Sequence, residues 1–227
     1  MRVALFGATG RAGGAILRQG HAAGYQIHAL VRTPGSLAAA PGEVSVGDVR
    51  DASAVERVMA GTDAAISAIG GTRASNPAVL EQGLASILAV MQRRSVRRLI
   101  VIQGFHLPFP GDPPGLGRPL MAAVLRSWNR RLSTDTYRMA ELLRASDLDW
   151  TLIRMPRLTE GPPGDDYRTG RFALGPWSTV TTGQVGHFAL TCLADGSFAR
   201  DAPMIATARA GRDTQPRRVE AVHEPLP

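Results

Sequence analysis

Apolar and polar positions alternate along the first 155 residues in a way that predicts strands and helices in turn. Short apolar runs typical of buried strands lie at Arg2–Phe6, Gln26–Val31, Glu43–Val46, Ala64–Ala68, Leu99–Ile102 and Trp150–Arg154. Apolar residues spaced three or four apart predict helices at Arg11–Ala23, after Asp51 as N-cap, from Asn76-Pro77 to Arg93, and at Leu120–Arg131 and Asp135–Ala145. Strands that alternate with helices are typical of an α/β fold with a parallel sheet.

The pattern becomes less regular on the C-terminal side. Prolines crowd residues 104–119, which excludes a regular helix or a central strand there. After the sixth strand we expect strand-like pieces near Arg171–Leu174 and Val180, a helix at Gln184–Leu193 and a last strand at Met204–Ala208. The chain therefore predicts one domain, 1–210, with substrate-side segments at about 104–134 and 156–182. Residues 211–227 form a polar tail, either a flexible arm or a segment that lies on a neighbouring chain.

A glycine-rich segment between the first strand and the first helix is the strongest chemical signal. Gly7 permits a tight turn, Gly10 lets the backbone approach a pyrophosphate, and Gly13 allows close contact of helix and strand. The helix N-terminus then offers free N–H groups to the anion. The residues expected to contact a dinucleotide here are Gly7, Thr9, Gly10, Arg11, Ala12 and Gly13.

The end of the second strand bears on which dinucleotide binds. Sites for NAD place a carboxylate there to hold the ribose 2′-hydroxyl, whereas this chain has Arg32 followed by Thr33. A guanidinium pairs with a 2′-phosphate, and Arg11 would add a second cation. The sequence thus favours NADP(H) over NAD(H), unless Arg32 is only a surface residue at a strand end.

Two later segments complete the expected dinucleotide site. Asp48 and Val49 follow the third strand, where the carboxylate would accept from the adenine amino group and the valine would pack on the ring. Asp48 would otherwise cap the next helix. Ala68, Ile69 and Gly70 close the fourth strand with small residues, as needed where backbone passes close to a ribose.

Composition narrows the chemistry. All 26 residues counted as Lys+Arg in the 227-residue chain are arginines, so Schiff-base and Tyr/Lys chemistry are excluded. The net charge of +7 is spread along the chain and is expected to be solvated surface rather than a nucleic-acid site.

Cys192 is the single cysteine, and the histidines lack metal-ligand spacing, so we expect no disulfide and no metal. Without a spanning run or a signal peptide, a cytoplasmic protein with no membrane partner is expected.

With these segments in view, the chain resembles the atypical short-chain dehydrogenases/reductases, and within them the NAD(P)H-binding group of biliverdin reductase B/flavin reductase and NmrA-like proteins. The resemblance covers about residues 1–208. It is carried by Gly7–Gly14, Leu30-Val31-Arg32, Gly47-Asp48-Val49, Asp135–Ser146, Leu148–Arg154 and Pro156-Arg157-Leu158-Thr159. It implies a doubly wound Rossmann-type sheet, an NADPH cofactor and reduction of a flat conjugated or carbonyl acceptor.

The chain departs from the catalytic pattern of the full dehydrogenases. Those have Ser or Thr at the end of the fifth strand and a Tyr followed four residues later by Lys; here the positions are Gln103-Gly104, Tyr137 and Glu141. Tyr137 is therefore expected to donate a hydrogen bond rather than act as a general base.

The remaining candidates lie beyond the fifth strand, where open α/β sheets bind ligands. Gln103, His106 and Tyr137 are the catalytic candidates, with His106 as proton donor unless it is a structural histidine. Phe105, Phe109 and Trp128 would form flat walls, although Phe105 and Trp128 would fit equally well in the core. Gln103 and Gly104, and Pro156, Arg157 and Leu158 after the sixth strand, are expected near the nicotinamide.

Three functions remain open. The first is an NADPH-dependent reductase of a flavin-, biliverdin- or quinone-like acceptor, which needs no Tyr/Lys pair because the nicotinamide carries the hydride. The second is a regulatory protein that holds NADP without turnover, as NmrA-like proteins do. The third is an isomerase or epimerase-like activity. The expected partner is a small-molecule substrate, and a homo-oligomer is left open.

Overall fold

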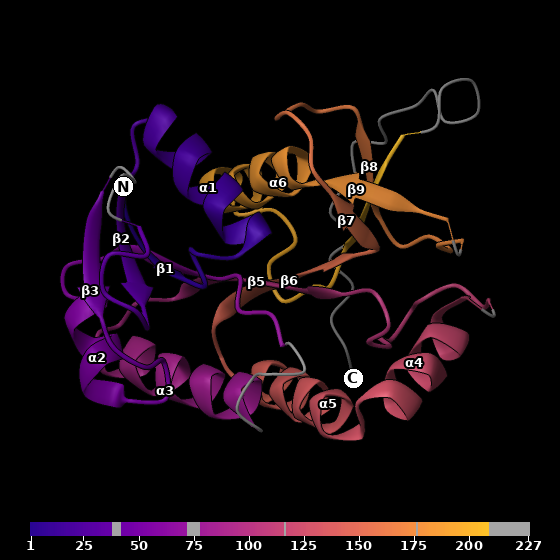
Figure 1. Ribbon diagram of the computed structural model, residues 1–227, viewed down its shortest axis with the longest axis horizontal. Coiled ribbons are helices and arrows are strands. Elements are labelled where there is room, and N and C mark those ends of the chain that lie inside the picture. The colour runs from indigo at the N-terminus through magenta and orange to yellow at the C-terminus, as the bar shows by residue number, and fades with distance from the viewer. Residues whose placement is uncertain (38–41, 72–77, 116, 176, 209–227) are drawn as a thin grey trace.

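The computed structural model describes residues 1–37, 42–71, 78–115, 117–175 and 177–208. Its centre is an eight-stranded sheet with helices on both faces (Figure 1). In sheet order the strands are β3 (Glu43–Val46), β2 (Gln26–Val31), β1 (Arg2–Phe6), β4 (Ala64–Ser67), β5 (Arg98–Gly104), β6 (Asp149–Met155), β10 (Met204–Thr207) and β8 (Tyr167–Gly170). The helices are α1 (Arg11–Ala22), α2 (Ala52–Val58), α3 (Val79–Arg93), α4 (Gly117–Trp128), α5 (Arg130–Ala145) and α6 (Thr182–Asp195).

The strand order confirms the doubly wound parallel sheet. β1 pairs with β2 on one side and with β4 on the other, so the direction of winding reverses between β1 and β4. All pairs of the main sheet are parallel except β8 with β10. Ligands of open α/β sheets bind at the carboxyl ends of strands beside such a reversal.

Each face of the sheet has its own apolar core. α1 and α6 cover one face, where Ile16 and Phe188 pack on β1 and β5 residues, and α2, α3 and α5 cover the other (Figure 1). Because the central strands are covered on both faces, they read in the sequence as nearly continuous apolar runs. This is why their bounds were predicted closely.

The C-terminal side differs from the prediction in two strands. The expected strand at Arg171–Leu174 is wrong, since β8 spans Tyr167–Gly170 and pairs antiparallel with β10. A short strand β7 (Arg157–Thr159) was not predicted and pairs with β9 (Thr179–Thr181) in a separate two-stranded sheet. Pro156 ends the run of the sixth strand in the sequence, which hid the three-residue strand behind it.

The fourth and fifth helices also begin earlier than predicted. α5 starts at Arg130 rather than Asp135, and Asn129 is its N-cap, whose Oδ1 accepts from the Leu132 N–H at 3.1 Å. α4 starts at Gly117, so Pro119 lies in its first turn, where a missing N–H costs nothing.

Asp135 therefore lies inside α5, and its carboxylate caps a different helix. It accepts from the Leu80 N–H at 2.9 Å and from the Glu81 N–H at 2.8 Å, at the start of α3. Asn76 and Pro77, the cap predicted from the sequence, lie outside the described residues, as does the tail 211–227. The N-cap predicted at Asp51 is confirmed by its bond from the Ser53 N–H at 2.9 Å.

A buried ion pair fixes the proline-rich segment that follows β5. Arg154, at the end of β6, is fully buried and donates to both carboxylate oxygens of Asp112 at 2.7 and 2.6 Å. The same guanidinium donates to the carbonyls of Leu107 and Ala202. Burial raises the pKa of Asp112, but the hydrogen bonds from Arg154 and from the Phe109 N–H, together with the charges of Arg154 and Arg118, outweigh burial and hold the pKa below its ordinary value. Arg154 thus joins β6, the approach to β10 and the 104–115 segment.

Candidate functional site

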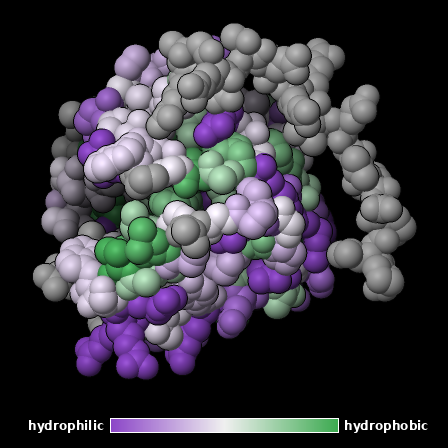
Figure 2. All heavy atoms as spheres, turned by 90° about the vertical axis from the view of Figure 1, so that its right-hand side faces the viewer, coloured by the Kyte–Doolittle hydropathy of each residue, from purple (hydrophilic) through white to green (hydrophobic). Residues whose placement is uncertain are grey.

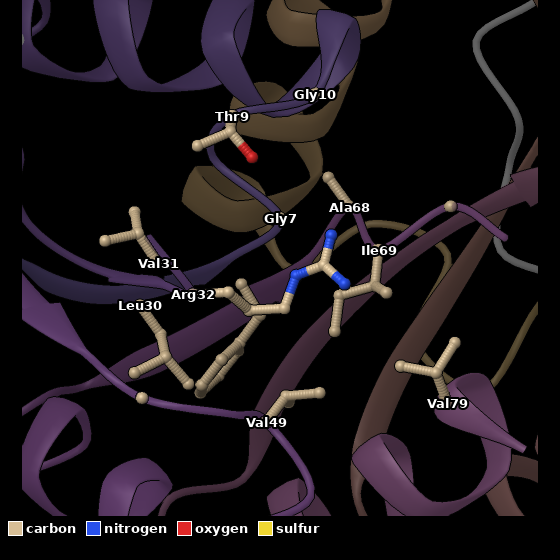
Figure 3. A pocket seen from close by; sticks show the side chains of 13 residues that line it. Gly7, Thr9, Gly10, Leu30, Val31, Arg32, Val49, Ala68, Ile69 and Val79 are labelled. Carbon is tan, nitrogen blue, oxygen red and sulfur yellow. The ribbon is translucent and has the colours of Figure 1, made fainter. Parts of the chain in front are cut away.

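A cavity of about 260 Å³ lies where the winding of the sheet reverses. Its walls come from the carboxyl ends of β1, β2 and β4, from the segment after β3, and from the first residue of α3. The lining residues are Phe6, Gly7, Thr9, Gly10, Leu30, Val31, Arg32, Gly47, Val49, Ala68, Ile69, Gly70 and Val79 (Figure 3). We call this the first cavity.

The glycine segment forms the turn from β1 into α1. Gly7 has a φ of +85°, which L side chains rarely adopt, and its carbonyl accepts from the Gly10 N–H at 3.0 Å. A Cβ at Gly13 would lie 2.1 Å from the Gly7 carbonyl oxygen, so only glycine lets the helix start this close to the strand. The α1 N-terminus has no side-chain cap and no acidic residue in its first turn, which suits an anion.

Arg32 extends from the end of β2 into the first cavity. Arg32 is exposed, and Figure 3 shows its guanidinium beside Ala68 and Ile69 at the open side of this cavity. Thr33 is exposed and does not line this cavity. Arg11 is engaged elsewhere, since its guanidinium donates to the Leu158 carbonyl at 3.0 Å and ties α1 to β7. Of the two cations expected at a 2′-phosphate, Arg32 is the one placed in the cavity.

Val49 lines the first cavity, but the carboxylate of Asp48 does not. Arg50 binds it through two side-chain bonds of 2.9 and 2.7 Å. The hydrogen bond from Arg50 lowers the pKa of Asp48 to about 2. Asp48 also does not cap α2, because Asp51 holds that position. Oδ2 of Asp48 accepts only one of these bonds, so the contact of Asp48 with an adenine stays a prediction.

A second cavity of about 290 Å³ opens beyond β4 and β5. α4 and α5 form its outer wall, and β5 and β6 form its floor. The lining residues are Ala12, Ala68, Gly70, Gly71, Ile102, Gln103, Gly104, His106, Leu125, Trp128, Asn129, Leu132, Ser133, Thr136 and Met155. None of these described lining residues carries a fixed charge, so the second cavity suits a largely neutral, apolar guest.

The two cavities share a wall made of small residues. Ala68 and Gly70 line both of them, and a Cβ placed at Gly70 would meet no atom within 4 Å. A long ligand that starts at the glycine turn therefore has open space to continue past Gly70 into the second cavity.

Two polar side chains face the second cavity from the end of β5. Gln103 is buried and donates its Nε2 to the Ile69 carbonyl at 3.0 Å, which fixes its carboxamide beside the shared wall. His106 is buried, and burial lowers its pKa to about 4. Burial therefore disfavours the charged imidazole, and the role of His106 as proton donor stays a prediction.

Comparison with known proteins agrees with this geometry. Residues 7–196 match the family described as NAD(P)H-binding. The chain belongs to the NAD(P)H-binding family.

Several solved structures of other proteins have the same fold as this chain. A protein from Lactobacillus casei superposes with a TM-score of 0.77 at 23% identity, over 92% of this chain and 100% of that one. ChuY, an anaerobilin reductase from Escherichia coli O157:H7, superposes with a TM-score of 0.74 at 17% identity, over 90% of this chain and 96% of that one. A putative NADH-flavin reductase from Streptococcus pneumoniae superposes with a TM-score of 0.70 at 17% identity, over 91% of this chain and 99% of that one. At these identities the likeness concerns the fold.

Several residues predicted for the site of this NAD(P)H-binding protein lie elsewhere. Phe105 packs in a separate cluster with Leu174, Met204 and Ala206 and does not line the second cavity. Phe109 packs edge-on to Trp150 against the core of the α3–α5 face.

Tyr137 also packs against the core of the α3–α5 face, with its ring 6.4 Å from that of His106. It does not line the second cavity, whereas Trp128 does.

The segment after β6 is placed next to the site but not in it. Pro156 is buried, Arg157 is exposed, and neither lines the first or the second cavity; Leu158 packs toward the α1–α6 core. The side chain of Met155, one residue earlier, does line the second cavity. Contacts between the backbone of this segment and the carboxamide of a nicotinamide stay a prediction.

Sequence reasoning missed the wall that α5 contributes. Leu132, Ser133 and Thr136 share one face of that helix and line the second cavity. Asn129 is a good N-cap residue, and a helix begun there would have placed this face toward the strand ends. Asp135 is also a good N-cap residue, and this is why the sequence pattern favours the later start.

Two further findings concern the described part of the chain. In it, no three His, Cys, Asp or Glu side chains lie close enough together to hold a metal ion. None of its helices is both long and apolar enough to cross a bilayer.

Proposed function

We propose that this protein is an NADPH-dependent reductase that delivers hydride to a flat conjugated or carbonyl compound held in the second cavity. The observation that carries the proposal is the shared wall of Ala68 and Gly70. A dinucleotide bound at the glycine turn would extend past this wall and present its nicotinamide to the second cavity. A transferable hydride and an acceptor would then lie within contact distance of each other.

The preference for NADPH rests on charge. Arg32 is the cation that projects into the first cavity, and the described residues lining that cavity include no carboxylate. A carboxylate there would bind a ribose 2′-hydroxyl and repel a 2′-phosphate, whereas a guanidinium attracts the phosphate.

The residues of the second cavity would orient the acceptor rather than activate it. When bound, the reduced nicotinamide supplies the hydride, so the chain needs no nucleophile or Tyr/Lys pair. Gln103 offers a fixed amide next to the shared wall, Trp128 offers a flat face, and the apolar residues exclude water. Since burial favours the uncharged form of His106, the proton that completes the reduction would come from solvent, and the N–H of His106 would donate a hydrogen bond to the acceptor.

The test measures loss of the nicotinamide absorbance when purified protein is mixed with NADPH and a panel of acceptors: flavins, a bilin, a quinone and a dichlorophenolindophenol dye. Protein-dependent oxidation of NADPH supports the proposal. Gly70→Val should abolish turnover because it fills the opening between the cavities. Gly164→Val is the matched control, because a Cβ at Gly164 also meets no atom within 4 Å but lies in neither cavity.

A non-catalytic NADP-holding sensor is the second candidate, and one observation favours it. The pKa of His106 is about 4, so the second cavity has no residue that is protonated and charged at pH 7 among those described. Tight NADPH binding without turnover on any acceptor would support the sensor and contradict the reductase.

A further inference from the structure

Two buried polar side chains on the walls of the second cavity lack a hydrogen-bond partner. Ser133 lies on α5 and is 4% exposed, and His106 follows β5 and is 9% exposed. Within the part of the chain that the structure describes, neither the Ser133 hydroxyl nor the His106 imidazole makes a hydrogen bond or an ion pair. Because buried polar groups are nearly always paired, two unpaired groups on one cavity wall indicate a ligand with a polar atom.

Neighbouring polar side chains of the same cavity already have partners. The Thr136 hydroxyl donates to the Leu132 carbonyl at 2.8 Å, and Gln103 donates its Nε2 to the Ile69 carbonyl at 3.0 Å. A hydroxyl inside a helix usually donates to the carbonyl four residues earlier, as that of Thr136 does. Ser133 does not make this bond, so its O–H proton is available to a ligand in the cavity.

Close packing of the backbone fixes the positions of both groups. The Leu132 side chain fills the space that a Cβ at Gly71 would need, so α5 and the neighbouring Ser133 are held against the end of β4. A Cβ at Gly104 would lie 2.7 Å from Nδ1 of His106, so the imidazole lies directly over the end of β5. The hydroxyl and the imidazole therefore reach the second cavity from two different walls.

The rest of the lining points to an uncharged partner. Among the described lining residues none carries a fixed charge, and Ile102, Leu125 and Met155 contribute apolar surface. Figure 2 looks onto the side of the molecule that carries α4, which forms the outer wall of this cavity, and apolar atoms gather in the middle of that face. A carboxylate or phosphate inside the cavity would have no opposite charge to pair with.

The number of donors narrows the kind of polar atom. A serine hydroxyl has one O–H to donate, and an uncharged imidazole has one N–H. One carbonyl oxygen has two lone pairs, and a quinone has two carbonyl oxygens, so a carbonyl compound of either kind can accept from both residues. A ring nitrogen that has a single lone pair can accept from only one.

We propose that Ser133 and His106 donate hydrogen bonds to the carbonyl oxygen of a neutral, conjugated acceptor. Ser133 thereby becomes a specificity-determining residue of the second cavity. Apolar side chains would cover the rings of the acceptor, while the two donors would hold its oxygenated edge.

This arrangement also has a role in the reaction, and that role rests on the reductase function proposed above. When the acceptor takes up the hydride with its two electrons, negative charge develops on the carbonyl oxygen, and NADP⁺ is left. The two donors would stabilise this charge before a proton from solvent completes the neutral product. Binding of the acceptor itself does not require hydride transfer.

The test is equilibrium dialysis of the full-length protein, with NADP⁺ present, against 1,4-naphthoquinone and, separately, naphthalene. The two compounds share the same ring system, but only the quinone has carbonyl oxygens. Ser133→Ala should weaken naphthoquinone binding about three- to tenfold, as expected for one neutral hydrogen bond, and leave naphthalene binding unchanged. His106→Leu should weaken naphthoquinone binding in the same way.

Ser127→Ala is the matched control. This serine is exposed on α4, its hydroxyl donates to the Val124 carbonyl at 2.9 Å, and it lines neither cavity. The control variant should bind both compounds as the wild type does. NADPH affinity, measured by calorimetry, should be the same in the wild type and in Ser133→Ala because Ser133 does not line the first cavity.

A kinetic measurement addresses the reaction. With NADPH and naphthoquinone, Ser133→Ala should lower kcat/KM for the quinone about tenfold and leave the KM for NADPH unchanged. Selective loss of naphthoquinone binding in a protein that oxidises no NADPH would support the carbonyl site and contradict only the reductase function.

Three results would overturn the proposal. One is that naphthoquinone does not bind to the wild type. Another is that Ser133→Ala weakens the binding of naphthoquinone and naphthalene by the same factor, which would mean that Ser133 only shapes the cavity. The third is that Ser133→Ala and Ser127→Ala both bind naphthoquinone as tightly as the wild type does.

Discussion

At the scale of single residues, Arg32 decides between the two nicotinamide coenzymes. Arg32→Ala should weaken NADPH binding by about 1.5–3 kcal/mol, the size of a hydrogen bond to a charged group, and leave NADH binding nearly unchanged. Titration calorimetry with each coenzyme measures both affinities. Arg18→Ala is the control, since Arg18 is exposed on α1 and lines neither cavity. Equal weakening for both coenzymes would show that Arg32 does not bind the 2′-phosphate.

His106 makes a second prediction through its pKa. The folded chain holds this pKa at about 4, whereas the unfolded chain takes up the proton near 6.5. The free energy of unfolding is therefore unaffected by His106 above about pH 7 and falls as the pH drops from about 6.5 towards 4. Between pH 7 and pH 4.5 this loss should reach roughly 2 kcal/mol.

Denaturant unfolding of wild type and His106→Gln at both pH values isolates this loss, because carboxylates that titrate in the same range are common to both proteins. The wild type should lose more stability than the variant on acidification. An equal loss would mean that the imidazole is protonated in the fold.

Sequence reasoning about individual residues succeeded where the backbone imposes the choice. Gly7 and Gly13 were predictable because a strand, a turn and a helix leave no room for a Cβ there. Phe105 and Phe109 were not, because the direction of each side chain depends on packing in a loop that Arg154 fixes from a distant strand. His106 was placed correctly at the strand end, but its burial could not be read from its neighbours.

At the scale of elements, the cap of α3 by Asp135 couples two helices. Asp135→Ala removes the acceptor for the buried Leu80 N–H and for the Glu81 N–H, and should lower the free energy of unfolding by about 1–3 kcal/mol. Asp51→Ala removes an exposed local cap of α2 and should cost about 1 kcal/mol. Thermal or denaturant unfolding ranks the two variants. A smaller loss for Asp135→Ala than for Asp51→Ala would contradict the role of Asp135.

Local signals predicted α2 and the central strands well, because their caps and apolar runs lie within the segments themselves. The same signals failed for α5. Asp135 has the side chain of an N-cap and precedes a good helical pattern, yet its carboxylate serves a helix that lies 54 and 55 residues away in the chain. A cap supplied by another element cannot be recognised from spacing along one helix.

At the scale of the whole molecule, the Arg154–Asp112 pair holds the C-terminal strands to the segment beside the second cavity. Arg154→Leu should cost about 3–5 kcal/mol, because it leaves a buried carboxylate with fewer partners. Arg97→Leu breaks the exposed pair with Asp149 and should cost about 0–1 kcal/mol. Chemical denaturation followed by circular dichroism measures both. Similar losses in the two variants would show that burial of the Arg154 pair adds nothing.

The overall architecture was predictable because alternating strand and helix patterns admit few arrangements, and a parallel sheet with crossover helices is the simplest. The place of the first cavity followed from the same pattern. The second cavity did not, since α4, α5 and the proline-rich segment meet there through contacts between residues far apart in the sequence.

The shared wall of Ala68 and Gly70 has a consequence for steady-state kinetics. If the reduced coenzyme forms one side of the acceptor's resting place, both compounds must occupy the protein together before hydride moves. Double-reciprocal plots at several fixed acceptor concentrations should then intersect, and the oxidised coenzyme should compete with NADPH. Parallel lines would mean that the first product departs before the acceptor binds. That result would contradict simultaneous binding of the coenzyme and the acceptor in the two cavities.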